Sequence, residues 1–445
     1  MKKHLMLASV LVAALISSAS AQLVMWTTEV QPSRMEKQAM IMANFEAETG
    51  ISVELVPVEE SSISERVTAA FAAGELPDVI AHPISQTIGW AAAGILDGEA
   101  ASEVVENLGA DTFAPGALAM SSYEDAIAAV PVSGWTQLLA YRADLFEEAG
   151  LAAPTSFESI LAAVEALHNP PEMYGFVAAT DPNQDYMMQV LEHFFLANGV
   201  SLLNDDGSAI SLDEAKTIEV LNFYKALADA SPEGNLYWAQ SRELFLAGQA
   251  AMIVWSPFLL DELAGLRDSA PVTAYDDPTS PALANASGFV TSIAGPSNPD
   301  GAGWASISNF GITVDADTDS AMQLVEFMMS SGYLDWLSFA PEGLFPVRRG
   351  TADDASAFID GWANLDVGVD RRAPLSQFYD ADVISNIVEG LDVAERWAYS
   401  KGQGALISRL YGTRVMTEVI RRFLDDELSA EDAAAQLIAR VTALQ

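Results

Sequence analysis

Residue types that often perform chemistry are scarce in this 445-residue sequence, and their spacing fits no catalytic motif. There is no cysteine, and the histidines beyond residue 21 stand far apart, at His82, His168 and His193. Nucleophile turns of the G-x-S-x-G type, phosphate loops and dinucleotide fingerprints do not occur. Sixty-two acidic residues could conceal a pair of glycosidase carboxylates, so a secreted glycosidase stays a distant alternative. We expect no enzyme activity, no catalytic residue, no metal ion and no cofactor.

Four tryptophans stand beside turn residues at the ends of predicted strands: Trp26, Trp135, Trp255 and Trp304. The C–H face of a pyranose ring stacks on an aromatic ring, while its hydroxyls need polar partners. In α/β sheets, ligands bind beyond the carboxyl ends of the strands. Each ring alone is as consistent with packing as with binding, but four in such places favour a ligand cleft. The other tryptophans lie in helix-like segments and are predicted to be core residues: Trp90, Trp238, Trp336, Trp362 and Trp397.

The elements that must position these rings follow from the apolar periodicity. Strands are predicted at 23–30, 51–58 and 77–82, with helices at 33–50 and 62–74, which indicates a layered α/β domain with a mostly parallel sheet. A strand across 128–146 is expected to cross between domains. Helices are predicted at 154–167, 184–199 and 211–229, and residues 270–303 are predicted as loops with one strand. A strand, a turn and a helix follow, then a loop over Glu342–Gly350, and the tail after Asp382 is predicted to be helical.

The first 21 residues are predicted to be a cleaved signal peptide. Two lysines precede an apolar run, and Ala19-Ser20-Ala21 is a cleavage signal. No cysteine follows it, so we expect an exported periplasmic protein without a lipid anchor. The mature chain is too long for one core, and at least two domains are expected.

The charge of the chain excludes several classes of partner. Sixty-two acidic residues against 21 basic ones give a net charge of −41, a field that repels nucleic acid and anionic membrane surfaces. The acidic residues are scattered over a chain that is 50% apolar, which favours a folded protein with an acidic surface over disorder. Such a surface suits a saline medium. A run of Ca²⁺ sites is the alternative, but no D-x-D-x-D-G loop occurs.

Several segments resemble, in the right order, the large extracellular solute-binding proteins of ABC importers, in particular those for oligosaccharides. They are FEAETGISVELVPV, AAGELPDVIAHPISQTIGWAAAGILDG, PVSGWTQLLAYRADLFEEAGLAAPTSFESILAAVEAL, LFLAGQAAMIVWSP, GAGWASISNFGITVDADTDSAMQLVEFMMS and EGLFPVRR. The resemblance implies a type II-like periplasmic-binding-protein fold of the large carbohydrate-binding subclass. Two α/β lobes would be joined by a hinge, with the ligand in the cleft between them and a membrane permease as partner.

The same resemblance implies which residues contact the ligand. It places Trp255 under the sugar, Gly303 and Trp304 on a glycine–aromatic segment, and Ser133 and Trp135 on the ligand-facing part of the crossing strand. Arg66 and Arg348 match arginines of the family, and Arg349 could replace Arg348. His82 falls one residue before a position where relatives carry an acid, and Trp135 stands where some carry aspartate. Trp26 and Glu29, at the end of the first strand, complete the predicted set.

We therefore expect an N-terminal lobe at 22–129 and 273–335 and a C-terminal lobe at 130–272 and 336–445. The predicted ligand is a neutral mono-, di- or short oligosaccharide. An anionic sugar or a glycerol phosphodiester, paired with Arg66 and Arg348, stays an open alternative. A polyamine is a weaker alternative for so acidic a chain. We expect a monomer that binds no nucleic acid.

Overall fold

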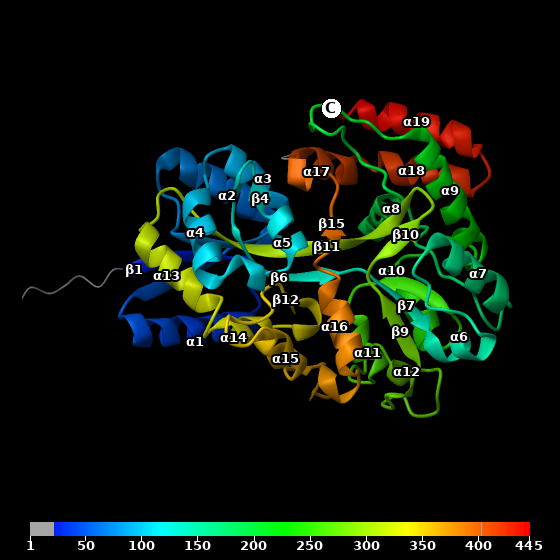
Figure 1. Ribbon diagram of the computed structural model, residues 1–445, viewed down its shortest axis with the longest axis horizontal. Coiled ribbons are helices and arrows are strands. Elements are labelled where there is room, and N and C mark those ends of the chain that lie inside the picture. Colours follow the sequence, from blue (N-terminus) through cyan, green and yellow to red (C-terminus); the bar gives the residue numbers. More distant parts are fainter. Residues whose placement is uncertain (1–21, 402) are drawn as a thin grey trace, which may run out of the picture.

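Alternating strands and helices open the chain and build the first of two α/β lobes (Figure 1). The computed structural model describes residues 22–445 apart from residue 402. The predicted signal peptide therefore lies outside the described residues. The opening elements are β1 (Gln22–Thr27), α1 (Pro32–Thr49), β2 (Ser52–Pro57), α2 (Glu60–Ala73) and β3 (Val79–Pro83). Their bounds agree with the predicted ones to within a few residues.

Helices cover the sheet of the first lobe. α1 turns Ile41, Met42 and Phe45 toward the sheet, where all three are buried. The other elements are α3 (Ile84–Ala92), α4 (Gly98–Leu108), η1 (Ala110–Thr112), α5 (Pro115–Met120), β4 (Ser122–Tyr123), β5 (Ala126–Ile127), α13 (Thr318–Met328) and α14 (Tyr333–Leu337).

The large sheet has eight strands, and it is mixed rather than mostly parallel as predicted. Its main path runs β12-β6-β11-β3-β1-β2, where β12 is Phe345–Pro346, β6 is Val130–Thr136 and β11 is Asn298–Ile312. β1 pairs in parallel with β2 and β3, but β11 runs antiparallel to both β3 and β6. The prediction was wrong here because β6 leaves the sheet toward the second lobe and β11 returns from it, so neither strand is joined to its neighbours by a right-handed βαβ crossover.

Two extended segments carry the chain between the lobes. One of them is the crossing strand that was predicted within 128–146. β6 belongs to the large sheet, and after Gln137 the chain continues as β7 (Leu138–Arg142) in a three-stranded sheet ordered β8-β7-β9. β11 passes beside β6 with Ser306 opposite Trp135, and a register shift interrupts the pairing at Ser308. Figure 1 shows β6 and β11 running side by side across the middle of the molecule.

The second lobe is mainly helical, as predicted for the middle of the chain. Its sheet is completed by β8 (Met252–Trp255) and β9 (Ser287–Val290). Its helices are α6 (Ala143–Ala149), α7 (Phe157–Leu167), α8 (Asp185–Ala197), α9 (Glu214–Asp229), α10 (Trp238–Leu246), α11 (Leu259–Leu263), α12 (Ala282–Asn285), α18 (Val415–Leu424) and α19 (Ala430–Thr442). The predicted lobe boundaries stay a prediction.

The segment 270–303 contains more regular structure than its Pro, Gly and Ser content predicted. Besides α12 and β9 it holds β10 (Ile293–Gly295) and the start of β11. β9 pairs with β7, which lies more than a hundred residues earlier, so no local pattern marked it.

The tail after Asp382 is largely helical, as predicted, but β15 (Ala394–Glu395) interrupts it and pairs with β11.

The remaining elements of the chain lie between residues 341 and 413. They are η2 (Pro341–Gly343), α15 (Ala357–Ala363), β13 (Asp366–Val367), β14 (Ala373–Pro374), η3 (Leu375–Gln377), α16 (Ala381–Glu389), η4 (Tyr399–Lys401) and α17 (Gly404–Thr413). Within the described residues, no helix combines the length and apolar character needed to cross a membrane.

Candidate functional site

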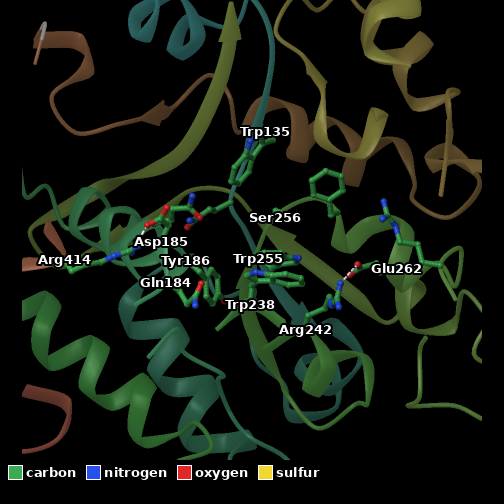
Figure 2. A pocket seen from close by; sticks show the side chains of 14 residues that line it. Trp135, Gln184, Asp185, Tyr186, Trp238, Arg242, Trp255, Ser256, Glu262 and Arg414 are labelled. Atoms are coloured by element: carbon green, nitrogen blue, oxygen red, sulfur yellow. Dashed lines mark hydrogen bonds and ion pairs between the residues drawn. The ribbon is translucent and has the colours of Figure 1, made fainter. Parts of the chain in front are cut away.

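A pair of stacked tryptophans forms the centre of the site (Figure 2). Trp255 is the last residue of β8, opposite Leu138 of β7, and Trp238 is the first residue of α10. Their ring centroids lie 4.9 Å apart with an interplanar angle of 13°, so the rings stack face to face. Tyr186 meets Trp255 edge-on at 5.3 Å and donates a hydrogen bond of 2.6 Å to the carbonyl oxygen of Val254. The pair is therefore fixed by the strand, the helix and Tyr186 together.

A cavity of about 650 Å³ opens over this pair. That volume lies within the ordinary range for small-molecule sites. Apart from Trp135 and Gln137, its lining comes from the second lobe and the tail that packs on it. The lining residues are Trp135, Gln137, Gln184, Asp185, Tyr186, Gln189, Trp238, Arg242, Trp255, Ser256, Phe258, Glu262, Arg267 and Arg414.

Trp135, which is half-buried at the end of β6, brings the crossing segment to the cavity. Its ring lies 5.0 Å from the ring of Trp304, which is only 1% exposed. The guanidinium of Arg396 lies 4.3 Å from the centroid of Trp304. Trp304 thus supports Trp135 and lies outside the lining of the cavity.

Two ion pairs line the cavity on opposite sides of the tryptophan pair, as Figure 2 shows. On one side, Arg414 lies 2.7 Å from Asp185 at the N-terminus of α8. On the other, Arg242 of α10 donates to Glu262 of α11 at 2.7 Å, and its guanidinium lies 4.9 Å from the centre of the Trp238 ring. Around the aromatic floor the site therefore offers charged groups that already have partners, together with the amides of Gln137, Gln184 and Gln189.

Arg267 adds a third charged group, and its partners lie behind the cavity wall. It pairs with Asp261 at 2.5 Å and with Glu342 at 2.8 Å. Asp261 and Glu262 are almost completely buried, at 0% and 3% exposed. Burial raises the pKa of Glu262, against the opposing effect of Arg242, and it raises the pKa of Asp261 to about 7.

We expect the wild-type protein to lose stability relative to Asp261→Asn as the pH rises from about 5 to about 8. Because the pKa of Asp261 is raised from 3.8 to about 7 by burial, the folded state keeps a proton that the unfolded state releases. The free energy of unfolding then falls through this window, by at most about 1.4 kcal/mol per pH unit. Urea denaturation of both proteins at several pH values measures the difference, and a difference that does not change with pH would contradict the expectation.

The structure brings two of the ten predicted site residues, Trp135 and Trp255, into the cavity. Gly303 lies next to Trp304 in β11, and a Cβ atom there would meet the carbonyl oxygen of Thr291 at 2.8 Å. Ser133 is fully buried in β6, where its hydroxyl has no hydrogen-bond partner among the described residues. Gly303 and Ser133 are therefore packed inside the crossing region.

Arg348 is engaged within the fold. It is 5% exposed and donates to the carbonyl oxygens of Met329 at 2.7 Å and Leu108 at 2.8 Å. Arg349 forms an ion pair with Asp392. Neither arginine lines the cavity, so the structure provides no support for their predicted contact with an anionic ligand.

Four predicted residues lie in the first lobe, outside the lining of the cavity. The guanidinium of Arg66 stacks on the ring of Trp26 at 4.8 Å. Glu29 forms an ion pair with Arg34. His82 is 1% exposed beside Trp90, and burial lowers its pKa to about 4. The structure thus brings Trp26 and Arg66 together and leaves His82 neutral inside the lobe.

Sequence reasoning missed Trp238, which it assigned to the core. Trp238 is half-buried and forms half of the aromatic floor. Its helix begins at this residue, after Tyr237, so the ring stands at a helix terminus where it can face a cleft. The ion pairs of Asp185 with Arg414 and of Glu262 with Arg242 were also missed. No spacing in the sequence distinguishes these two acids from the other acidic residues.

Comparison with known proteins finds a matching family and a matching relative. The model of a family described as bacterial extracellular solute-binding protein matches residues 40–364. The putative ABC transporter periplasmic-binding protein YcjN of Escherichia coli (strain K12) is 27% identical over 344 residues, which cover 75% of this chain and 74% of that protein.

Two solved structures show the same fold along almost the whole chain. The cyclic alpha-maltosyl-1,6-maltose binding protein from Arthrobacter globiformis has a TM-score of 0.71 at 17% identity, covering 95% of this chain and 98% of that one. The sugar-binding protein MalE from Xanthomonas citri has a TM-score of 0.71 at 19% identity, covering 95% and 97%.

Proposed function

Because the chain belongs to the bacterial extracellular solute-binding proteins, we propose that it captures an uncharged sugar for an ABC importer. The observation that supports the sugar is the cavity, in which the stacked Trp238 and Trp255 lie among amides and ion-paired side chains. Such a combination fits a ring with apolar faces and a polar rim. The relative from Escherichia coli is named as an ABC transporter component, and the two structural relatives are named for sugars.

The pairing of the charged groups favours an uncharged ligand over the anionic and polyamine alternatives. Each arginine of the cavity already contacts at least one acid: Arg242 pairs with Glu262, Arg414 with Asp185, and Arg267 with Asp261 and Glu342. An anion would have to compete with these carboxylates in a chain of net charge −41. An ammonium group would have to bind beside a guanidinium that already pairs with the carboxylate.

The mechanism that we propose is a shift between open and closed arrangements of the lobes. The cavity is lined by the second lobe, its tail and the end of β6, so a ligand seated there leaves the first lobe free to close over it. Trp26 and Arg66, stacked together near the end of β1, are the first-lobe groups that we propose to contact the ligand on closure. A ligand that contacts both lobes stabilises the closed form by its differential affinity.

The cellular setting that we propose follows from the same family. The chain would be exported, lose residues 1–21 and act as a periplasmic monomer that delivers its sugar to a permease. It would hold the sugar without hydrolysing it, because Asp185 and Glu262, the carboxylates of the cavity, are both bound by arginines.

We expect neutral sugars to raise the melting temperature of the purified mature protein in a thermal-shift screen. A ligand at a hundred times its Kd adds about 2.7 kcal/mol, which gives a shift of several degrees. The panel contains neutral mono- and disaccharides, phosphorylated and sulfonated sugars, glycerol phosphodiesters and polyamines, in moderate salt.

The controls of the screen separate the alternatives. Shifts produced by anions alone would overturn the uncharged-sugar proposal, and shifts produced by polyamines alone would do the same. Chromatography of the bound sugar after prolonged incubation should return it intact, whereas shorter products would support a glycosidase.

A further inference from the structure

One wall of the cavity holds buried polar atoms that lack a hydrogen-bond partner within the described part of the chain. They are the Oγ atom of Ser256, the Oε2 atom of Glu262, the Nε atom of Arg242 and the Nε1 atom of Trp255. Ser256 is 8% exposed and Glu262 is 3% exposed, and all four residues line the cavity. Folded proteins satisfy more than nine-tenths of their buried polar groups, so a cluster of unsatisfied ones at a cavity indicates a missing partner.

Glu262 is held so that only one of its oxygens is available. Its Oε1 atom accepts the hydrogen bond of 2.7 Å from Arg242, which stacks on Trp238. The carboxylate is therefore fixed to the aromatic floor through Arg242, and Oε2 is left as a charged acceptor. A hydrogen bond to an ionised acceptor is roughly twice as strong as a neutral one.

Trp255 is the last residue of β8 and Ser256 follows it directly, so both side chains leave the chain at the same strand end. The serine hydroxyl can both donate and accept, and it reorients by rotation about one bond. The indole Nε1–H can only donate. Together with Glu262, this edge offers two acceptors and two donors beside a stacked aromatic surface.

We propose that Ser256 and Glu262 bind two neighbouring hydroxyl groups of an uncharged sugar ring that is seated on Trp255. Glu262 Oε2 accepts a hydroxyl proton, while Ser256 and the Trp255 Nε1–H bond the adjacent oxygen. The inference rests on the proposed function and specifies its substrate class as a ring with two adjacent free hydroxyls at the bound edge. A phosphate or sulfonate group in that position would meet the charge of Glu262 and be rejected.

The test measures binding and stability in the mature full-length chain. Calorimetry with D-glucose, maltose, cellobiose, laminaribiose and trehalose first identifies the sugar that the wild type binds most tightly. We expect Glu262→Gln to weaken binding of that sugar at least tenfold and Ser256→Ala to weaken it about fivefold. Since the Ser256 hydroxyl has no hydrogen-bond partner among the described residues, Ser256→Ala should leave the melting temperature unchanged or slightly raised, which a structural role would not do.

Glu418→Gln is the control for the change of a glutamate to glutamine, because Glu418 pairs with Arg440 in an exposed ion pair and does not line the cavity. The affinity of this variant should stay within twofold of the wild type. If Glu262→Gln fails to fold, Ser256→Ala decides the question alone. If the wild type binds and both Ser256→Ala and Glu262→Gln keep its affinity, this inference alone is overturned, and an equal loss in Glu418→Gln would overturn it as well. No wild-type binding of any of the five sugars overturns the proposed function together with it.

Discussion

Replacement of Glu192 by alanine is expected to lower the free energy of unfolding by about 3–5 kcal/mol. Glu192 lies in α8 and is completely buried. Its carboxylate accepts hydrogen bonds from the Arg396 Nε atom at 2.9 Å, the Trp397 backbone N–H at 2.8 Å and the Tyr411 hydroxyl at 2.5 Å. Without it, three donors lose their acceptor, and one of them is the charged guanidinium of the buried Arg396.

The size of this effect follows from the burial of Arg396. Burial alone would lower the pKa of Arg396, but Glu192, with smaller contributions from Tyr411 and Tyr399, more than offsets this effect, and the pKa is raised. Removal of one partner from a buried ion pair leaves an uncompensated charge, which is far more destabilising than the loss of an exposed pair. The same glutamate joins α8 to the segment after β15, so the variant also loosens the tail that supports Trp304.

Urea denaturation followed by circular dichroism measures the expected loss. The control is Glu418→Ala, which removes a partner of Arg440 from an exposed ion pair of 2.9 Å and should change the free energy by at most about 1 kcal/mol. Glu192→Gln, which keeps the shape but not the charge, should fall between the two. Equal small effects of Glu192→Ala and Glu418→Ala would contradict the assignment of a structural ion pair.

The sequence predicted those parts of the fold that depend on local chemistry. α1 ends where predicted because Gly50 adopts a left-handed conformation with φ of 77°, and the early strands follow from their apolar runs. One strand was predicted within 270–303 but not placed, and β15 was not predicted, since β9 and β15 each depend on a partner strand far away in the sequence. Long-range pairing also explains why the sheet is mixed, because no local pattern shows the direction in which β11 enters it.

The sequence predicted only those cavity residues that stand at the ends of strands, Trp135 and Trp255. Trp255 was found because a ring directly after a buried strand, beside Ser256 and Pro257, needs a reason. Trp304 was suggested by its place at a strand end and by the resemblance, and Arg348 by the resemblance alone, but neither signal gives the direction of a side chain. In the structure Trp304 packs behind Trp135, and Arg348 bonds backbone carbonyls. Trp238 was missed because a tryptophan in a helix is more often a core residue.

Replacement of Trp255 by alanine is expected to weaken sugar binding at least tenfold, or about 1.4 kcal/mol. The ring is half-buried, and it loses contact with the sugar together with its stacking on Trp238. Trp238→Ala should also weaken binding, because Trp255 then lacks the surface that fixes its orientation. Both variants should remain folded, since Tyr186 and β8 are held by contacts of their own.

A double-mutant cycle by calorimetry tests whether the two rings act as one platform. Because the rings are in face-to-face contact, the loss in Trp238→Ala/Trp255→Ala should be smaller than the sum of the single losses. Trp255→Phe should keep most of the affinity that depends on stacking and lose the part that depends on the Nε1–H. Phe71→Ala, which removes a 38% exposed ring on α2 outside the cavity, should bind within twofold of the wild type. Unchanged affinity in both single tryptophan variants would show that the two rings do not contribute to binding. Recognition of the sugar would then depend on Ser256 and Glu262.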